Sequence, residues 1–278
     1  MTVTERSGPA TQTAKQAMAI RWHKLPLELV LLFTLFVAYR AGRLLTINHE
    51  SAAFANAREI WHIERWMHLP MEQDVQGWLL HSVHLVELAN TYYAFVHFPA
   101  TVAFMVFMFL RRPAHYFWVR RALIIMTAAS LAVHVLFPLA PPRMRPDLGF
   151  VDTGTLFGPN VYGPPEGGSI ANQFAAMPSL HIGWAVLVAF GLIVALRSRW
   201  RWLFVAHPII TILVVVGTAN HGWLDGIVAI VLLGGALAVS VGVDRVHVNT
   251  FLRRQEEEAT ASAEVSRAAG PRLPRPRS

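Results

Sequence analysis

The sequence contains no cysteine among its 278 residues. Disulfide bonds, thiolate zinc sites and cysteine nucleophiles are therefore excluded within this chain. Charged residues are also scarce, at 15%, compared with about 25% in a typical soluble domain. Apolar residues make up 54% of the chain, and the mean hydropathy is +0.40. This composition argues against an ordinary soluble enzyme, a disordered chain and a nucleic-acid-binding arm.

The apolar residues gather in runs that are long enough to cross a membrane as helices. A membrane-spanning helix needs roughly 17–25 mostly apolar residues. Six runs qualify, at about residues 26–45, 89–110, 118–138, 180–196, 202–219 and 223–243. The sequence lacks the alternating segments of about ten residues that build membrane barrels. It therefore predicts an all-α integral membrane protein with six transmembrane helices.

This organisation divides the chain into three parts. Residues 1–25 form a polar N-terminus, residues 26–245 a six-helix membrane domain, and residues 246–278 a tail. The tail is rich in charge, alanine, proline and arginine and offers no apolar face to bury, so it is predicted to be disordered. Because the N-terminus stays polar well beyond the usual start of a signal peptide, the first apolar run is predicted to be a retained helix.

Lysine and arginine predict the orientation, since they favour the cytoplasmic side of a membrane. With six spans, most of the basic residues near the span ends fall on one side, together with both termini. The chain is thus predicted to be a multi-pass protein of the cell membrane with cytoplasmic termini. Residues 46–88 and 139–178 then lie outside. The first segment is predicted to form one or two amphipathic helices in the membrane interface, and the second an irregular but ordered loop.

Three polar stretches meet at the outer side in this topology. They are residues 141–146 (PPRMRP), 176–181 (AMPSLH) and 218–225 (TANHGWLD). Segments that are far apart in the sequence but share one depth in the membrane predict an extracytoplasmic site.

Two histidines and an aspartate in these stretches suit nucleophilic chemistry. His221 and Asp225 are four residues apart, so they share a face of a helix. An aspartate that accepts a hydrogen bond from one ring nitrogen fixes the tautomer and makes the other nitrogen a better nucleophile. His181 can act as a general acid towards a leaving oxygen. The alternative for the His221–Asp225 pair is a structural contact between helices.

The remaining residues of the stretches suit anion binding. Arg143 and Arg145 can bind phosphate oxygens, and Ser179 precedes a helix whose free N–H groups favour an anion. Lipid-headgroup anchoring for the arginines and a plain helix boundary at Ser179 are the alternatives. No acidic cluster in the sequence suggests bound magnesium, so neither a metal nor another cofactor is expected.

Further polar residues lie near the outer ends of the first two spans and beside His221. The candidates for a substrate pocket are Arg43, Asn90, Tyr93, His97 and Asn220. The alternative is ordinary hydrogen bonding between helices.

The three stretches resemble the signature motifs of the type-2 phosphatidic acid phosphatase superfamily. The forms PSLH and NHxxxD are similar to its inositol phosphotransferase-like branch, typified by fungal inositol phosphorylceramide synthase. The resemblance covers about residues 135–240. It implies a six-helix core, His221 as a nucleophile that becomes phosphohistidine, Asp225 as its partner, and His181 as acid and base.

The sequence departs from the pattern of the family phosphatases at three places. Leu180 replaces the usual glycine, Pro138 stands at the position of a lysine, and Val214–Val215 replace a serine–arginine pair. The phosphate ligands therefore cannot all be assigned by analogy. Arg143 is the first choice and Arg145 the second.

The resemblance implies a membrane enzyme that moves a phosphoryl-containing group from a lipid phosphate or phosphodiester. Inositol or another polyol as acceptor would make it a phosphotransferase, and water would make it a lipid or polyprenyl (di)phosphate phosphatase. A non-enzymatic scaffold or lipid transporter is the remaining alternative. The expected partner is a membrane lipid and not a nucleic acid, while the oligomeric state is not determined.

Overall fold

The computed structural model describes residue 37 and residues 50–161 and 173–244 of the chain. Apart from Val37, the first predicted span lies outside the described residues, as do Arg43, the polar N-terminus and the predicted tail. The described part is helical, as predicted, with one isolated bridge between Leu139 and Ala175. Its elements are α3 (Glu50–Trp66), α4 (Glu72–Leu80), α5 (Val83–Phe95), α6 (His97–Arg111), α7 (Pro113–Leu136), η1 (Pro142–Met144), η2 (Pro146–Leu148), α8 (Thr153–Phe157), α9 (Leu180–Ala195), η3 (Arg199–Val205), α10 (Ala206–Gly217) and a last helix, Trp223–Asp244.

Three helices among these residues are long and apolar enough to cross a membrane. They are Pro113–Leu136, Arg199–Gly217 and Trp223–Asp244. The pair α5 and α6, bent by 44°, is a fourth candidate if it crosses as one span. Helix α9 is apolar but has only 16 residues. The chain is thus a multi-pass membrane protein with three or four candidate spans, and the number six stays a prediction.

The predicted second span, residues 89–110, is broken between α5 and α6. Pro99 lies in the first turn of α6. A proline ring has no N–H to donate and clashes with the carbonyl four residues earlier, which here belongs to Phe95. The helix therefore ends near Val96 and starts again, with Ala100 N donating to the carbonyl of Val96 at 2.9 Å.

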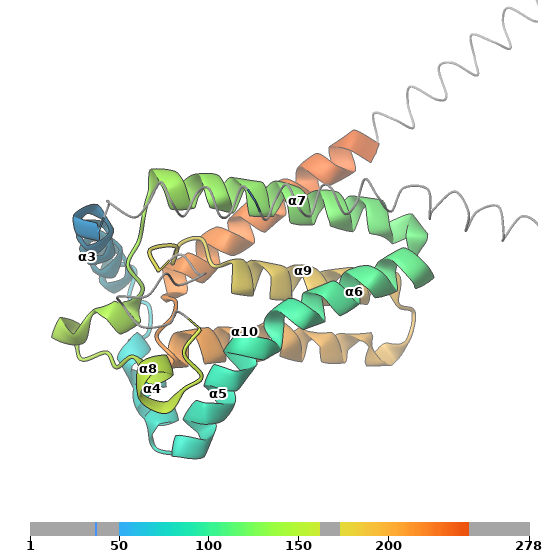
Figure 1. Ribbon diagram of the computed structural model, residues 1–278. Helices are drawn as coiled ribbons and strands as arrows, with labels where there is room; N and C mark the ends of the chain where they lie inside the picture. The colour runs from blue at the N-terminus through green and yellow to red at the C-terminus, as the bar shows by residue number, and fades with distance from the viewer. Residues whose placement is uncertain (1–36, 38–49, 162–172, 245–278) are drawn as a thin grey trace, which may run out of the picture.

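Helix α9 packs against α6, α7 and α10, which run alongside it in Figure 1. Two glycines allow its neighbours to come close. A Cβ atom on Gly183 would lie 1.7 Å from the side chain of Met126, and one on Gly191 would lie 2.5 Å from Phe104. Both partners belong to the main apolar cluster, so α9 is a central element of the core.

Two arginines cap the C-terminal end of α9. Arg112 Nε donates to the carbonyl of Ala195 at 3.0 Å, and Arg201 Nη1 donates to those of Ile193 and Leu196 at 3.2 and 3.1 Å. The last carbonyls of a helix have no partner within it, so these side chains satisfy acceptors that lipid could not. Arg112 and Arg201 thus supply the hydrogen bonds that the last carbonyls of α9 lack within the helix.

The opposite end of the bundle carries α3, α4, α8 and the loop that follows α7 (Figure 1). Two helices, α3 and α4, form the segment for which one or two amphipathic helices were predicted. Their acidic residues do not all face outward, however, because Glu64 and Glu72 are only 3% and 1% exposed.

Side chains from α4 and α5 hold the loop. Gln76 exchanges two hydrogen bonds of 2.9 Å with the backbone of Val151. Asn90 donates to the carbonyls of Thr153 and Gly158 and accepts from the Thr153 hydroxyl, all at 2.9 Å. Buried polar contacts therefore order the described part of the loop up to residue 161, although much of that part has no regular secondary structure.

Replacing Gln76 by alanine should loosen this loop. The change leaves the N–H and the carbonyl of Val151 without their partner, and each unsatisfied buried group costs roughly 1–3 kcal/mol. We expect a lower thermal midpoint in detergent and faster proteolysis within residues 146–161. Gln73→Ala is the matched control, since Gln73 is less buried and makes one bond of 3.2 Å to Leu148. Equal effects of the two substitutions would contradict the assignment.

Candidate active site

His221 lies in a buried turn between α10 and the last helix. The amides of Asn220 and His221 both donate to the carbonyl of Val215, at 2.9 and 3.1 Å, and so close the turn. The side chains of His221 and Asp225 are almost fully buried. The turn thus presents an imidazole and a carboxylate inside the protein.

The protonated ring nitrogen of His221 is identified by its partner. Nδ1 lies 2.8 Å from the carbonyl oxygen of Ala176. A carbonyl oxygen can only accept, so Nδ1 carries the hydrogen. In the tautomer with one hydrogen on Nδ1, Nε2 has the lone pair that a nucleophile requires.

Asp225 lies beside the same ring nitrogen of His221. Its Oδ2 atom lies 3.5 Å from Nδ1 of His221 and accepts a hydrogen bond of 2.8 Å from the amide of Gly222. The spacing of four residues does bring the two side chains together. The nearest acceptor for Nδ1 is nevertheless the Ala176 carbonyl, which belongs to a different segment.

His181 lies on the first turn of α9 and faces His221, with ring centroids 5.5 Å apart. Its ring also packs on Tyr93 and His97, with centroids at 4.4 and 4.6 Å. Ser179 caps the helix, its Oγ accepting from Ile182 N at 3.4 Å. The amide of Ser179 donates to the backbone carbonyl of Asp225 at 3.0 Å, which joins the two histidine-bearing segments.

Arg143 is fixed directly to the turn that carries His221. Its amide donates to the carbonyl of Ala219 at 2.8 Å, and its Nε donates to Oδ1 of Asn220 at 2.9 Å. Asp152 lies 3.7 Å from its Nη1. Asn220 therefore orients the Arg143 guanidinium from within the turn.

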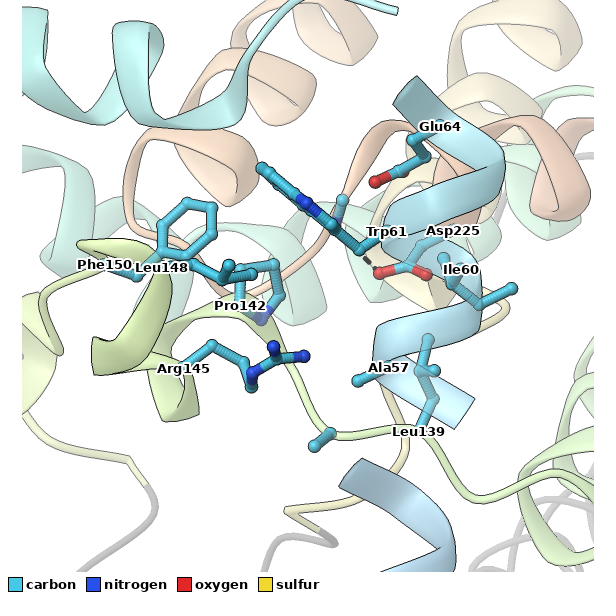
Figure 2. A pocket seen from close by; sticks show the side chains of 12 residues that line it. Ala57, Ile60, Trp61, Glu64, Leu139, Pro142, Arg145, Leu148, Phe150 and Asp225 are labelled. Atoms are coloured by element: carbon cyan, nitrogen blue, oxygen red, sulfur yellow. Dashed lines mark hydrogen bonds between the residues drawn. The ribbon is translucent and has the colours of Figure 1, made fainter. Parts of the chain in front are cut away.

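Arg145 is held differently. Its guanidinium forms a two-bond pair with Asp147, with distances of 2.9 and 2.8 Å. This contact lowers the pKa of the Asp147 carboxyl below its ordinary value. Arg145 also lines a pocket together with Trp61, Glu64 and Asp225, between the loop and α3 (Figure 2).

The structure brings most of the predicted site residues to one place. Those that gather around His221 are His181, Asp225, Ser179, Arg143, Asn220, Tyr93 and His97. Arg145 lies on the side of Asp225 that faces the pocket. The amide of Asn90 is occupied by the loop.

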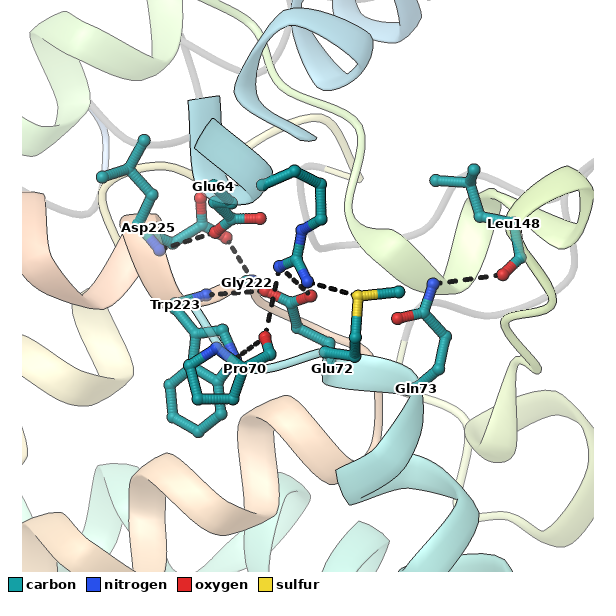
Figure 3. A network of polar contacts seen from close by, with 11 residues as sticks. Glu64, Pro70, Glu72, Gln73, Leu148, Gly222, Trp223 and Asp225 are labelled. Atoms are coloured by element: carbon teal, nitrogen blue, oxygen red, sulfur yellow. Dashed lines mark hydrogen bonds and ion pairs between the residues drawn. The ribbon is translucent and has the colours of Figure 1, made fainter. Parts of the chain in front are cut away.

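Sequence reasoning missed two carboxyl groups, Glu64 and Glu72, which lie beside Asp225. They accept hydrogen bonds at the start of the helix that follows His221, from Leu224 N at 2.7 Å and Trp223 N at 3.5 Å (Figure 3). Burial, together with the charge of Glu72, raises the pKa of Glu64 to about 8. No sequence signal marked these residues, because acidic side chains on an amphipathic helix are normally solvated. In the described part of the chain, no group of three or more histidine, aspartate or glutamate side chains could hold a metal ion.

The family model described as "PAP2 superfamily" matches residues 58–239. This range covers more than half of the chain and runs from α3 into the last helix. The chain belongs to the PAP2 superfamily. The predicted superfamily is therefore confirmed, and membership indicates a membrane lipid phosphate phosphatase or phosphotransferase of a family whose members are typically metal-independent. Comparisons with curated proteins and with solved structures found no match.

The protonation of His221 can be tested without any substrate. We expect selective ¹⁵N labelling of the histidines to show that Nδ1 of His221 carries a hydrogen, because the Ala176 carbonyl accepts from that atom. Loss of the signal in His221→Asn would assign it. A neutral ring with the hydrogen on Nε2 would contradict the arrangement described above.

Proposed function

We propose that this PAP2 protein transfers a phosphoryl-containing group from a membrane lipid phosphate or phosphodiester, by way of a phosphohistidine at His221. The observation that carries the proposal is the hydrogen bond from His221 Nδ1 to the Ala176 carbonyl. It leaves Nε2 with a lone pair in a buried site that also contains a second histidine and an arginine.

The reaction has two steps in this proposal. In the first, His221 Nε2 attacks phosphorus, the bond to the leaving oxygen breaks, and His181 gives that oxygen a proton. In the second, His181 takes a proton from the acceptor hydroxyl as this attacks phosphorus, and the P–N bond breaks. The ring separation of 5.5 Å supports this division, since both rings can reach one bound phosphate. Asp225 stabilises the positive charge that develops on His221.

Arg143 is the proposed main phosphate ligand. Its tether to Asn220 keeps the guanidinium beside the nucleophile, where it can balance the charge of the transition state. Arg145 is the second choice, because Asp147 already occupies two of its N–H groups. Ser179 contributes through the start of α9, whose N-terminal dipole favours an anion.

A polyol such as inositol is the proposed acceptor, with water as the alternative. The forms PSLH and NHxxxD support the transferase branch, in which leucine replaces the glycine of the phosphatases at position 180. Tyr93 and His97 pack against His181 and are candidates for the wall of the acceptor or headgroup pocket. A scaffold or lipid transporter would carry out neither reaction.

For the membrane arrangement we propose six spans, made by residues 26–45, the pair α5–α6, α7, α9, the segment Arg199–Gly217 and the last helix. The catalytic domain then covers residues 26–245, between a cytoplasmic N-terminus and a cytoplasmic tail. The arginines that cap α9 lie at the end of that helix opposite Ser179. Because arginine favours the cytoplasm, this placement supports an active site on the outer face.

Variants of the two histidines test the chemistry. His221→Ala should abolish turnover and the trapped phosphoenzyme, which should be acid-labile and base-stable as a phosphoramidate is. His181→Ala should slow turnover by roughly 10²–10⁴-fold, and by less with a good leaving group, because general acid help then matters less. His62→Ala, at an exposed position on α3, should behave as the parent protein. A phosphoryl group trapped on His181 would reverse the two roles.

Assays of the purified protein distinguish a polyol acceptor from water. Lipid phosphate and phosphodiester donors would be supplied with and without inositol or other polyols, and inorganic phosphate and new lipid products would be measured separately. Formation of a new lipid supports the transferase, and release of phosphate alone supports the phosphatase. No turnover of any donor would favour a scaffold or transporter.

Single cysteines in this cysteine-free chain test the orientation. Gly154 lies in α8 near the site, and Ser198 precedes η3 at the far end of α9. A membrane-impermeant thiol reagent applied to intact cells should label Gly154→Cys and not Ser198→Cys. The reverse pattern would place the site on the cytoplasmic face.

A further inference from the structure

The helix that follows His221 begins at a buried point, and carboxyl groups from three elements accept its first N–H groups. Asp225 Oδ2 accepts from Gly222 N at 2.8 Å within the helix itself. Glu72 of α4 and Glu64 of α3 accept from the next two amides, at 3.5 and 2.7 Å (Figure 3). Two of the three acceptors thus come from outside the helix that they cap.

We propose that Glu64 is a positioning residue of this active site, which from α3 holds the first turn of helix Trp223–Asp244 and so fixes His221 and Asp225 for the reaction. The inference rests on the proposed function of His221. Glu64 acts on the nucleophile only through the backbone of the turn that carries His221.

The fit of Glu64 against this turn is close. Its side chain is 3% exposed, and a Cβ atom on Gly222 would lie 2.9 Å from its Oε1 atom. A side chain at position 222 would therefore press on the carboxyl oxygen that accepts from the amide of Leu224. Glu64 thus limits where the residue next to His221 can lie.

The charges around Glu64 give this contact a dependence on pH. The groups that face it are Glu72, which hydrogen bonds to it, Asp225 and, at the edge of the shared pocket, Arg145. Arg65 forms an ion pair of 3.1 Å with Glu72. A hydrogen bond between two carboxyl groups needs one proton, and because Glu72 has the arginine partner, the proton belongs to Glu64.

Burial raises the pKa of Glu64 to about 8, with the charges of Glu72 and Asp225 adding to the effect. At neutral pH the group is therefore un-ionised and adds no charge beside Asp225. Above pH 8 it loses its proton, so that a further negative charge faces Asp225 and the hydrogen bond to Glu72 is lost. The turn that carries His221 should then move out of position.

Glu64→Gln tests whether positioning of the turn depends on the proton of Glu64 or only on the hydrogen bond that caps the helix. Glutamine keeps an oxygen for Leu224 N and a donor for Glu72, so it imitates the protonated acid at every pH. Glu64→Ala removes both contacts. Glu59→Gln and Glu59→Ala are matched controls, since Glu59 is an exposed carboxylate on the same helix.

The first measurement is kcat and KM of the full chain towards a lipid phosphate from pH 6 to pH 9.5. The parent protein should lose kcat by about tenfold per pH unit above pH 8, as one titrating group gives. Glu64→Gln should keep most of the neutral activity and lack this decline. Glu64→Ala should lose kcat by up to about 10²-fold with KM little changed, since a small misplacement of the nucleophile has that effect. The Glu59 variants should follow the parent profile.

The second measurement does not depend on turnover. The pKa of Glu64 is higher in the folded protein than in the unfolded protein. The parent therefore loses stability, relative to Glu64→Gln, as the pH rises from about 4.5 to about 8. The thermal midpoints of the two proteins in detergent should therefore diverge over that range and keep a constant difference above it.

The outcomes separate the two hypotheses. Parallel midpoints of the parent and Glu64→Gln would overturn the proposal for Glu64, whatever the enzyme does. The proposal would also be overturned if the alkaline decline of kcat persists in Glu64→Gln, or if kcat is unchanged in Glu64→Ala. Glu64 would then be a structural cap only. Diverging midpoints without turnover of any lipid phosphate would instead count against the proposed function.

Discussion

The hydrogen bond from His221 to the carbonyl of Ala176 is the contact on which the rest of the site depends. It joins the turn after α10 to the segment that leads into α9. A second bond, from Ser179 N to the carbonyl of Asp225, joins the same two segments one step further on. In an apolar bundle each of these groups would be costly if unpaired. The two bonds therefore hold the starts of the two helices side by side, and the first of them identifies Nδ1 as the ring nitrogen of His221 that carries a hydrogen.

Polar side chains surround the two hydrogen bonds that join these segments, and the apolar bundle lies beyond them. Asn220 holds Arg143, and Gln76 and Asn90 hold the loop that carries the two arginines. The contacts of Gln76 and Asn90 are made with backbone groups of the loop. The loop can therefore be irregular and still be ordered, since side chains supply the hydrogen bonds that regular structure would otherwise provide.

Three carboxyl groups gather beside the turn that carries His221. Asp225, Glu64 and Glu72 lie close together, with Arg65 paired to Glu72. Three ionised carboxylates in one buried place would repel one another strongly. A proton on Glu64 removes that repulsion and also supplies a hydrogen bond, so the acidity of one side chain becomes linked to the geometry of the turn.

The apolar helices and the proximity of the main polar residues are predictable from the sequence alone. The long runs that form α7, the segment Arg199–Gly217 and the last helix are visible because lipid requires a continuous apolar length. The spacing of His221 and Asp225 predicts that they lie close together, and they do, although His221 lies in the turn before the helix and not within it. The superfamily was identified from the same local motifs.

The partners of these residues, in contrast, depend on how distant segments pack together. The Ala176 carbonyl is the nearest acceptor for His221, Asn90 binds the loop, and Glu64 is buried beside Asp225. Each of these facts depends on a segment that lies tens of residues away and on backbone groups that carry no sequence signal. The periodicity of α3 shows which residues are polar, but whether a polar residue faces water or another buried turn depends on what packs against it.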